Sequence, residues 1–112
     1  MGVDPNVAII GAGPAGLMAA EVLLEKDIAV NIFEAKPTIG RKLLMAGKSG
    51  LNITHTENFK LFLSRFSSQT NTLEDSIRSF TPTMLQQWTS NLGIETFEGS
   101  SKRVFPREMK AS

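Results

Sequence analysis

The stretch at residues 7–34 reads VAIIGAGPAGLMAAEVLLEKDIAVNIFE, and the rest of the chain is organised around it. It opens with an apolar run at residues 7–10, which is typical of a buried parallel strand. A helical pattern of apolar residues follows, and then a second apolar strand that ends at Glu34. This order predicts a β-α-β unit over residues 7–34 and an α/β fold class.

Three glycines follow the first strand with the spacing G-x-G-x-x-G. We expect Gly11 to make a tight turn, Gly13 to let the main chain approach a pyrophosphate, and Gly16 to let the helix pack closely on the strand. Pro14 suits the first turn of the helix, whose N-terminal N–H groups and dipole favour phosphate. Glu34 follows about 20 residues later, where an acid binds an adenosine ribose and repels the 2′-phosphate of NADP.

These features together predict a Rossmann-like domain that binds a dinucleotide. The alternative is a glycine-rich turn without a ligand, but strand, helix and acid occur here in the order that the fingerprint requires. The chain has no cysteine, and its single histidine, His55, has no partner pattern for a catalytic dyad. We therefore assign no catalytic residue and no metal site, and we expect redox chemistry to reside on a bound cofactor.

Length and composition are those of one ordinary globular domain, with 112 residues, 41% hydrophobic and 21% charged. The net charge of +1 gives no general attraction to nucleic acid. The sequence has neither a long apolar run nor a secretory signal. We expect a cytoplasmic protein whose partners are a dinucleotide cofactor and, in a full-length protein, a small-molecule substrate, with no nucleic-acid or membrane partner.

Residues 35–56 are punctuated by glycine and proline and are too long for a simple connection. They predict a cofactor loop with a short helix at residues 41–46. Arg41, Lys42 and Lys48 place three positive charges after the fingerprint. Contact with an anion and a basic loop in solvent are both compatible with this pattern.

Residues 11–16, Glu34 and Gly40 together resemble the FAD-binding start of the two-dinucleotide-binding-domain flavoproteins. Later runs make the chain similar to bacterial NAD(P)/FAD-dependent oxidoreductases of the aminoacetone-oxidase type; they lie at residues 40–47, 52–54, 103–106 and 111–112. The resemblance covers nearly the whole chain but only the first quarter of such a protein. We therefore expect an N-terminal fragment that is not active alone.

The resemblance implies FAD as the resident cofactor of a flavin-dependent oxidoreductase, with NAD(P)H or an organic substrate as electron source. A non-catalytic NAD- or ADP-binding module is the alternative function. Relatives carry Gly-Gly-Gly-Arg-Cys-Asn where residues 47–52 read Gly-Lys-Ser-Gly-Leu-Asn, so roles of that arginine and cysteine do not carry over. Fingerprint and resemblance together predict these cofactor-binding residues: Gly11, Ala12, Gly13, Pro14, Ala15, Gly16, Glu34, Ala35, Arg41, Lys42, Gly47, Lys48 and Asn52.

Residues 57–92 carry apolar side chains at helical spacing and predict three helices. We expect these side chains to pack into a core rather than to form a platform for a ligand or a nucleic acid. Thr72 with Asp75 suits a capping box at the start of the second helix. Thr81 followed by Pro82 predicts the start of the third helix.

The C-terminal part completes the expected domain organisation. Gly93 is expected to end the third helix, and residues 94–106 predict a small antiparallel hairpin. A sheet of only two parallel strands leaves the first strand with an open edge, which favours self-association. An interaction protein whose helices bind a partner is a third, weaker hypothesis for function.

Overall fold

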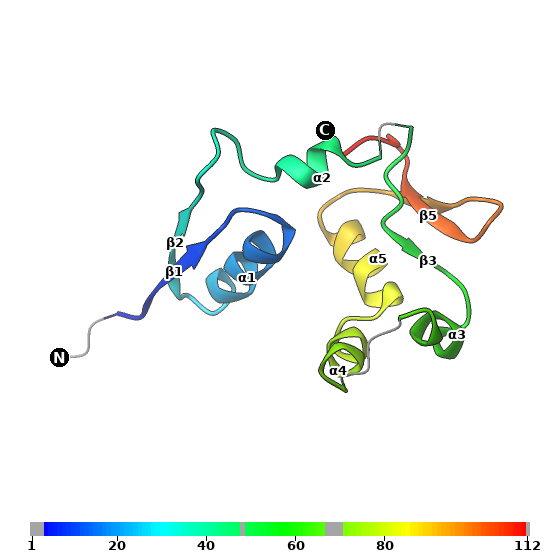
Figure 1. Cartoon of the computed structure of the whole chain (residues 1–112), viewed down its shortest axis with the longest axis horizontal. Coiled ribbons are helices and arrows are strands. Elements are labelled where there is room, and N and C mark those ends of the chain that lie inside the picture. Colours follow the sequence, from blue (N-terminus) through cyan, green and yellow to red (C-terminus); the bar gives the residue numbers. More distant parts are fainter. Residues whose placement is uncertain (1–3, 48, 67–70, 112) are drawn as a thin grey trace. The chain divides into compact units, whose positions relative to one another are not determined.

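The structure is a computed structural model that describes residues 4–47, 49–66 and 71–111. The chain forms two compact units (Figure 1). The first unit runs to Ala46, and the second extends from Gly47 to Ala111. The predicted fingerprint therefore lies wholly within the first unit.

The first unit is built around two parallel strands, β1 (Asn6–Ile10) and β2 (Ala29–Phe33). Helix α1 (Pro14–Leu24) connects them, and the short helix α2 (Arg41–Met45) follows β2. The order strand, helix, parallel strand confirms the α/β, Rossmann-type prediction. Helix α1 begins at Pro14, which confirms the predicted helix start. Proline suits this position because a residue in the first turn needs no partner for its N–H.

The second unit combines a small antiparallel sheet with three helices. The sheet has the strand order β3-β5-β4. Its elements are β3 (Thr54–His55), α3 (Phe59–Ser64), α4 (Asn71–Ser79), α5 (Pro82–Asn91), β4 (Thr96–Glu98) and β5 (Arg103–Pro106). Strands β4 and β5 form the predicted hairpin. The sequence did not indicate β3, because two residues are too few to show an alternating pattern.

Helix α5 begins and ends as its sequence predicts. The Thr81 hydroxyl accepts a hydrogen bond from the Met84 N–H at 3.2 Å, and Pro82 is the first helical residue. After the helix, Gly93 takes a φ of +80° and its N–H bonds to the Ser90 carbonyl at 2.9 Å. Both ends are therefore determined locally, by a capping hydroxyl and by a glycine that tolerates positive φ.

The capping box predicted for α4 is wrong. The helix already includes Asn71, so Thr72 lies inside it rather than before it. The Thr72 carbonyl accepts a hydrogen bond from the Ser76 hydroxyl at 2.9 Å, as a carbonyl inside a helix can. The polar residues 67–71 also predict a break before this helix; most of them lie outside the described residues, and Asn71 itself is helical.

The expected helical core is less buried than the apolar spacing suggested. Among the described residues, the buried hydrophobic side chains are Ala12, Ala20, Val104 and Pro106. Phe66 remains 42% exposed and Phe80 41% exposed, although the Phe62 ring contacts those of Phe59 and Phe66. Helical spacing shows that side chains share a face, but burial also needs a second layer that covers that face.

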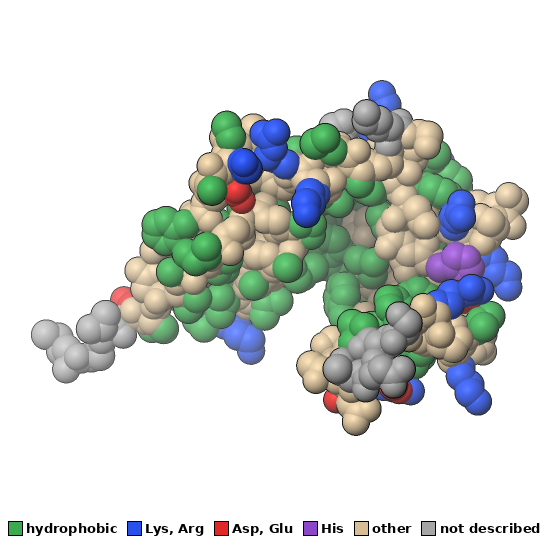
Figure 2. All heavy atoms as spheres, in the orientation of Figure 1, with side chains coloured by type: hydrophobic (Ala, Val, Ile, Leu, Met, Phe, Trp, Pro, Cys, Tyr) green, Lys and Arg blue, Asp and Glu red, His purple; other side chains and the backbone are tan. Residues whose placement is uncertain are grey.

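The strands of the first unit also leave apolar side chains in solvent. Ile10 is 82% exposed and Phe33 is 56% exposed. Figure 2 shows hydrophobic side chains at the surface over β1 and β2. One helix cannot cover both faces of a sheet whose strands are mostly apolar, so part of this surface stays open.

Candidate functional site

The turn after β1 depends on two glycines for steric reasons. Gly11 takes a φ of +100°, and its N–H donates to the Phe33 carbonyl at 2.7 Å. A Cβ added at Gly16 would lie 2.0 Å from the Gly11 carbonyl oxygen and 3.3 Å from the Ile9 side chain. Both residues must therefore be glycine for the turn to form and for α1 to approach β1.

Gly13 differs from its two neighbours in the motif. Its φ of −84° is open to any residue, and an added Cβ would meet no atom within 4 Å. The fold itself does not require glycine at this position. What the missing side chain provides is free space directly beside the main chain, as close approach by a ligand requires.

Helix α1 begins without a side-chain cap. Gly13 is the N-cap residue, and the Leu17 N–H is bonded to the Gly13 carbonyl at 3.0 Å. The N–H groups of Ala15 and Gly16 precede that bond and have no acceptor within the helix. The first turn also has no acidic residue. The helix start thus presents uncompensated donors and the positive end of its dipole.

Glu34 is held against the glycine turn by main-chain donors. Its Oε2 accepts a hydrogen bond from the Ala12 N–H at 2.8 Å, and its Oε1 accepts one from the Lys36 N–H at 3.0 Å. The Ala12 and Lys36 hydrogen bonds lower the pKa of Glu34, since they favour the charged carboxylate. The side chain is therefore ionised at neutral pH and fixed beside the motif.

A cavity of about 290 Å³ lies between the glycine turn and the segment that follows β2. The segment is brought to the turn by Gly40, which is buried, takes a φ of +62° and donates its N–H to the Ala12 carbonyl at 2.8 Å. The cavity is lined by Ala12, Gly13, Pro14, Glu34, Lys36, Thr38, Gly40, Arg41 and Lys42. It thus combines main chain, one carboxylate and three basic side chains.

The structure brings together about half of the predicted cofactor-binding residues at this cavity, namely Ala12, Gly13, Pro14, Glu34, Arg41 and Lys42. Others belong to the same unit without lining the cavity: Gly11, Ala15, Gly16 and Ala35. Gly47 and Asn52 belong to the second unit, and Lys48 lies outside the described residues. Contact of each with a cofactor stays a prediction.

Two lining residues, Lys36 and Thr38, were not among the predicted residues. Their position directly after Glu34 was the available signal, because the chain must pass the ribose-binding acid on leaving β2. The Thr38 hydroxyl also contacts the Arg41 guanidinium at 3.5 Å. This weak contact tethers one basic side chain at the edge of the cavity.

The part of the chain that the structure describes has neither a membrane-spanning helix nor a metal-binding cluster. Across these residues, no helix combines the length and apolar character needed to cross a bilayer. The same residues contain no group of three His, Cys, Asp or Glu side chains placed to hold a metal ion. The cavity beside the glycine turn is the first candidate for function because it combines main chain with a fixed carboxylate and basic side chains.

Comparison with known proteins finds several relatives. Thiamine thiazole synthase of Pyrobaculum aerophilum is 34% identical over 82 residues, which cover 73% of this chain and 31% of that protein. AegA of Escherichia coli K12, whose name includes the term oxidoreductase, is 53% identical over 38 residues, 34% of this chain and 6% of that protein. Ribosomal RNA dihydrouridine synthase of Haemophilus influenzae is 45% identical over 49 residues, 44% of this chain and 12% of that protein.

These matches cover only part of each relative. The aligned segments amount to 31% or less of the three proteins. The family model described as the HI0933-like protein Rossmann domain matches residues 5–112. It confirms both the Rossmann fold and the resemblance to FAD-binding oxidoreductases drawn from the sequence. The chain belongs to the HI0933-like Rossmann domain family.

Proposed function

We propose that the cavity of the first unit holds the ADP half of FAD, and that this chain is the FAD-binding module of a flavin-dependent oxidoreductase. One observation carries the proposal: an ionised Glu34, fixed by the Ala12 N–H, lines the same cavity as the glycine turn. The bound flavin would supply the electron transfer. NAD(P)H or an organic substrate would provide the electrons in a full-length protein.

The residues of the cavity fit the parts of an ADP group. The main-chain donors at the start of α1 would bind the pyrophosphate, which can approach because Gly13 has no side chain. The Glu34 carboxylate would accept hydrogen bonds from ribose hydroxyls, and its charge would disfavour a 2′-phosphate. Arg41 and Lys42 would balance the negative charge of the phosphates.

The remaining predicted residues belong to the same proposal. Gly47, Lys48 and Asn52 would follow the diphosphate toward the flavin, as the family resemblance implies. They come after α2 in the chain, whereas every residue that lines the cavity comes before Leu43. Binding of FAD would therefore require contacts with these three residues, whereas binding of ADP alone would not.

A non-catalytic NAD- or ADP-binding module is the second candidate. It is favoured by the fact that the cavity is lined only by residues of the first unit, which account for the ADP half that FAD and NAD share. Titration of the chain with FAD, NAD and ADP separates the two functions. Tighter binding of FAD than of ADP supports the flavin module, and equal or weaker binding of FAD supports the alternative.

Replacement of Gly13 by valine tests the cavity as the nucleotide site. The new side chain enters open space and leaves the fold intact, but it occupies the position where the pyrophosphate would lie. We expect affinity for FAD and ADP to fall by a factor of about 100, because close main-chain approach is lost. Isothermal titration calorimetry would measure both affinities.

The matched control is Ala19→Val, which places the same valine side chain at an exposed position of α1 that does not line the cavity. Its affinity for FAD should equal that of the unaltered chain. If Gly13→Val binds FAD and ADP as tightly as Ala19→Val does, the nucleotide lies elsewhere and the proposal fails.

A further inference from the structure

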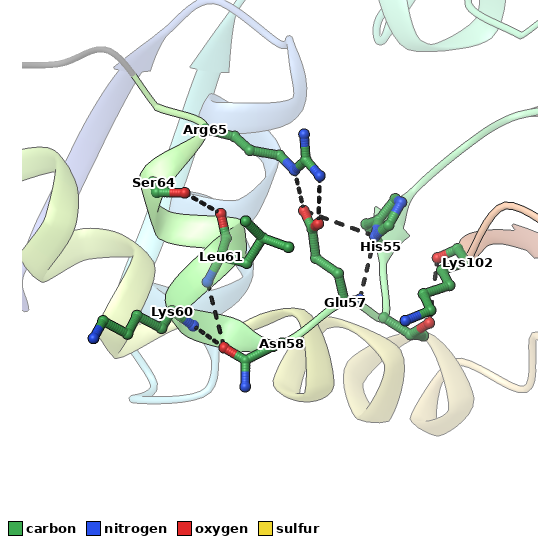
Figure 3. Close-up of polar contacts among 9 residues, drawn as sticks. His55, Glu57, Asn58, Lys60, Leu61, Ser64, Arg65 and Lys102 are labelled. Atoms are coloured by element: carbon green, nitrogen blue, oxygen red, sulfur yellow. Dashed lines mark hydrogen bonds and ion pairs between the residues drawn. The ribbon is translucent and has the colours of Figure 1, made fainter.

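The turn between β3 and α3 contains a buried carboxylate that is already neutralised. The Glu57 side chain is 4% exposed, and its two oxygens accept hydrogen bonds from Arg65 Nε at 2.5 Å and Nη2 at 2.7 Å (Figure 3). The hydrogen bonds from Arg65 lower the pKa of Glu57, so the pair is a carboxylate and a guanidinium at neutral pH. The pair carries no net charge, and it ties the end of α3 to the end of β3.

The same turn fixes the tautomer of His55, the single histidine of the chain. Its Nδ1 accepts a hydrogen bond from the Glu57 N–H at 3.2 Å and lies 3.8 Å from the Glu57 Oε1 (Figure 3). A ring nitrogen that accepts a hydrogen bond carries no proton, so neutral His55 carries its proton on Nε2. Within the described residues, Nε2 has no hydrogen-bond partner, and Figure 2 shows the imidazole at the surface among Lys and Arg side chains.

His55 lines a second cavity, of about 180 Å³, within the second unit. One wall comes from the β3–α3 turn and the other from the start of α5; the lining residues are His55, Thr56, Glu57, Phe59, Thr81, Pro82, Thr83 and Gln86. The side chains of Thr83 and Gln86 have no hydrogen-bond partner among the described residues. A hydroxyl, an amide and an imidazole thus line the same cavity.

The charges around this cavity favour an anion. The positive charge of Arg65 neutralises the Glu57 carboxylate. Lys102 lies near enough to Glu57 for its positive charge to contribute to the lowered pKa of that carboxylate. Arg103 is the residue directly opposite His55 in the β3–β5 pair. With neutral His55, the nearby side chains have a net positive charge. Phe59 and Pro82 add an apolar wall that suits the carbon part of an organic anion.

We propose that this cavity binds a small organic carboxylate, with the His55 Nε2–H, the Gln86 amide and the Thr83 hydroxyl as donors. The site is separate from the proposed nucleotide cavity, since the two are lined by residues of different units.

Nuclear magnetic resonance of the single imidazole tests the proposal directly. Long-range ¹H–¹⁵N spectra should show the Nε2–H tautomer in the free chain. Acetate should then shift the ring resonances saturably, and more than sodium chloride does at equal ionic strength. Acetamide, which has the same shape without the charge, should not shift them. A protonated Nδ1 in the neutral ring, or equal effects of acetate, acetamide and chloride, would overturn the proposal.

Gln86→Leu sharpens the test by removing one donor. We expect acetate affinity to fall about tenfold, the typical loss for a hydrogen bond to a charged group. Gln87→Leu is the matched control, because Gln87 bonds to Asn91 and does not line the cavity. Its acetate titration should equal that of the unaltered chain. Equal acetate affinity in the two variants would show that Gln86 makes no contact with the anion and would contradict the site.

Discussion

The two units of the chain use different means to build a cavity. In the first unit, the cavity is formed by main chain at the glycine turn and by Glu34, which main-chain N–H groups hold in place. In the second unit, the cavity depends on side chains, with Arg65 neutralising Glu57 and the Glu57 N–H orienting His55. A main-chain site imposes strict steric rules on the sequence, whereas a side-chain network can be made by many sequences.

The units also differ in what a substitution should do. In the first unit, a Cβ added at Gly16 would meet the Gly11 carbonyl oxygen, which cannot move without breaking the turn. In the second, Val104 is the one fully buried large side chain of the described residues, and it lies in the central strand of the sheet. We therefore expect steric substitutions to have their largest effects in the first unit and cavity-creating ones in the second.

Gly16→Val should produce the largest effect. Its Cβ would lie 2.0 Å from the Gly11 carbonyl oxygen, so the turn and α1 must shift; we expect a loss of at least about 3 kcal/mol in the first unit. Amide hydrogen exchange should show loss of protection in β1 and β2. Trp88, in α5, is the single tryptophan and reports on the second unit, so its fluorescence midpoint in urea should not change.

Gly13→Val provides the contrast for this prediction, since it adds the same side chain where no atom lies within 4 Å. It should keep the exchange protection of both strands. If Gly16→Val also lowers the Trp88 midpoint, the units are energetically coupled, and the comparison between separate regions no longer holds.

Val104→Ala should produce an intermediate effect, confined to the second unit. Val104 is 1% exposed, and loss of its two methyl groups should lower the free energy of unfolding by about 2 kcal/mol. The Trp88 midpoint in urea would measure this loss. Val22→Ala is the matched control, because Val22 is 44% exposed and belongs to the first unit. An unchanged midpoint in Val104→Ala would show that the small sheet does not stabilise the second unit.

Glu57→Gln should produce the smallest effect, which is present at neutral pH and disappears in acid. Arg65 lowers the pKa of Glu57 below its ordinary value of 4.5, so the ionised group stabilises the fold at neutral pH. This stabilisation is lost as the pH falls through the lowered pKa. Glutamine does not titrate, so the Trp88 midpoint should depend less on pH between about pH 5 and about pH 3. The same acid dependence in both proteins would contradict the role of this pair.

Much of the first unit could be predicted because local geometry dictates its residues. Gly11 must tolerate a positive φ, Gly16 must leave room for a carbonyl, and Pro14 suits a helix start; each restriction is visible in one sequence. The start and end of α5 followed from Thr81 and Gly93 for the same reason. Burial was harder to predict, since the exposure of Phe66 and Phe80 depends on which layers cover them.

The sequence by itself determined the β-α-β unit, the glycine turn and the acid beside it, because these depend on backbone sterics over short distances. Only the tertiary structure showed that the Gly40 N–H bonds to the Ala12 carbonyl beside the first cavity. The same holds for the Arg65–Glu57 pair and for the position of His55 in the lining of a second cavity. Those contacts join residues without a shared periodicity or motif. Their formation depends on how loops return to the sheet, which no local propensity specifies.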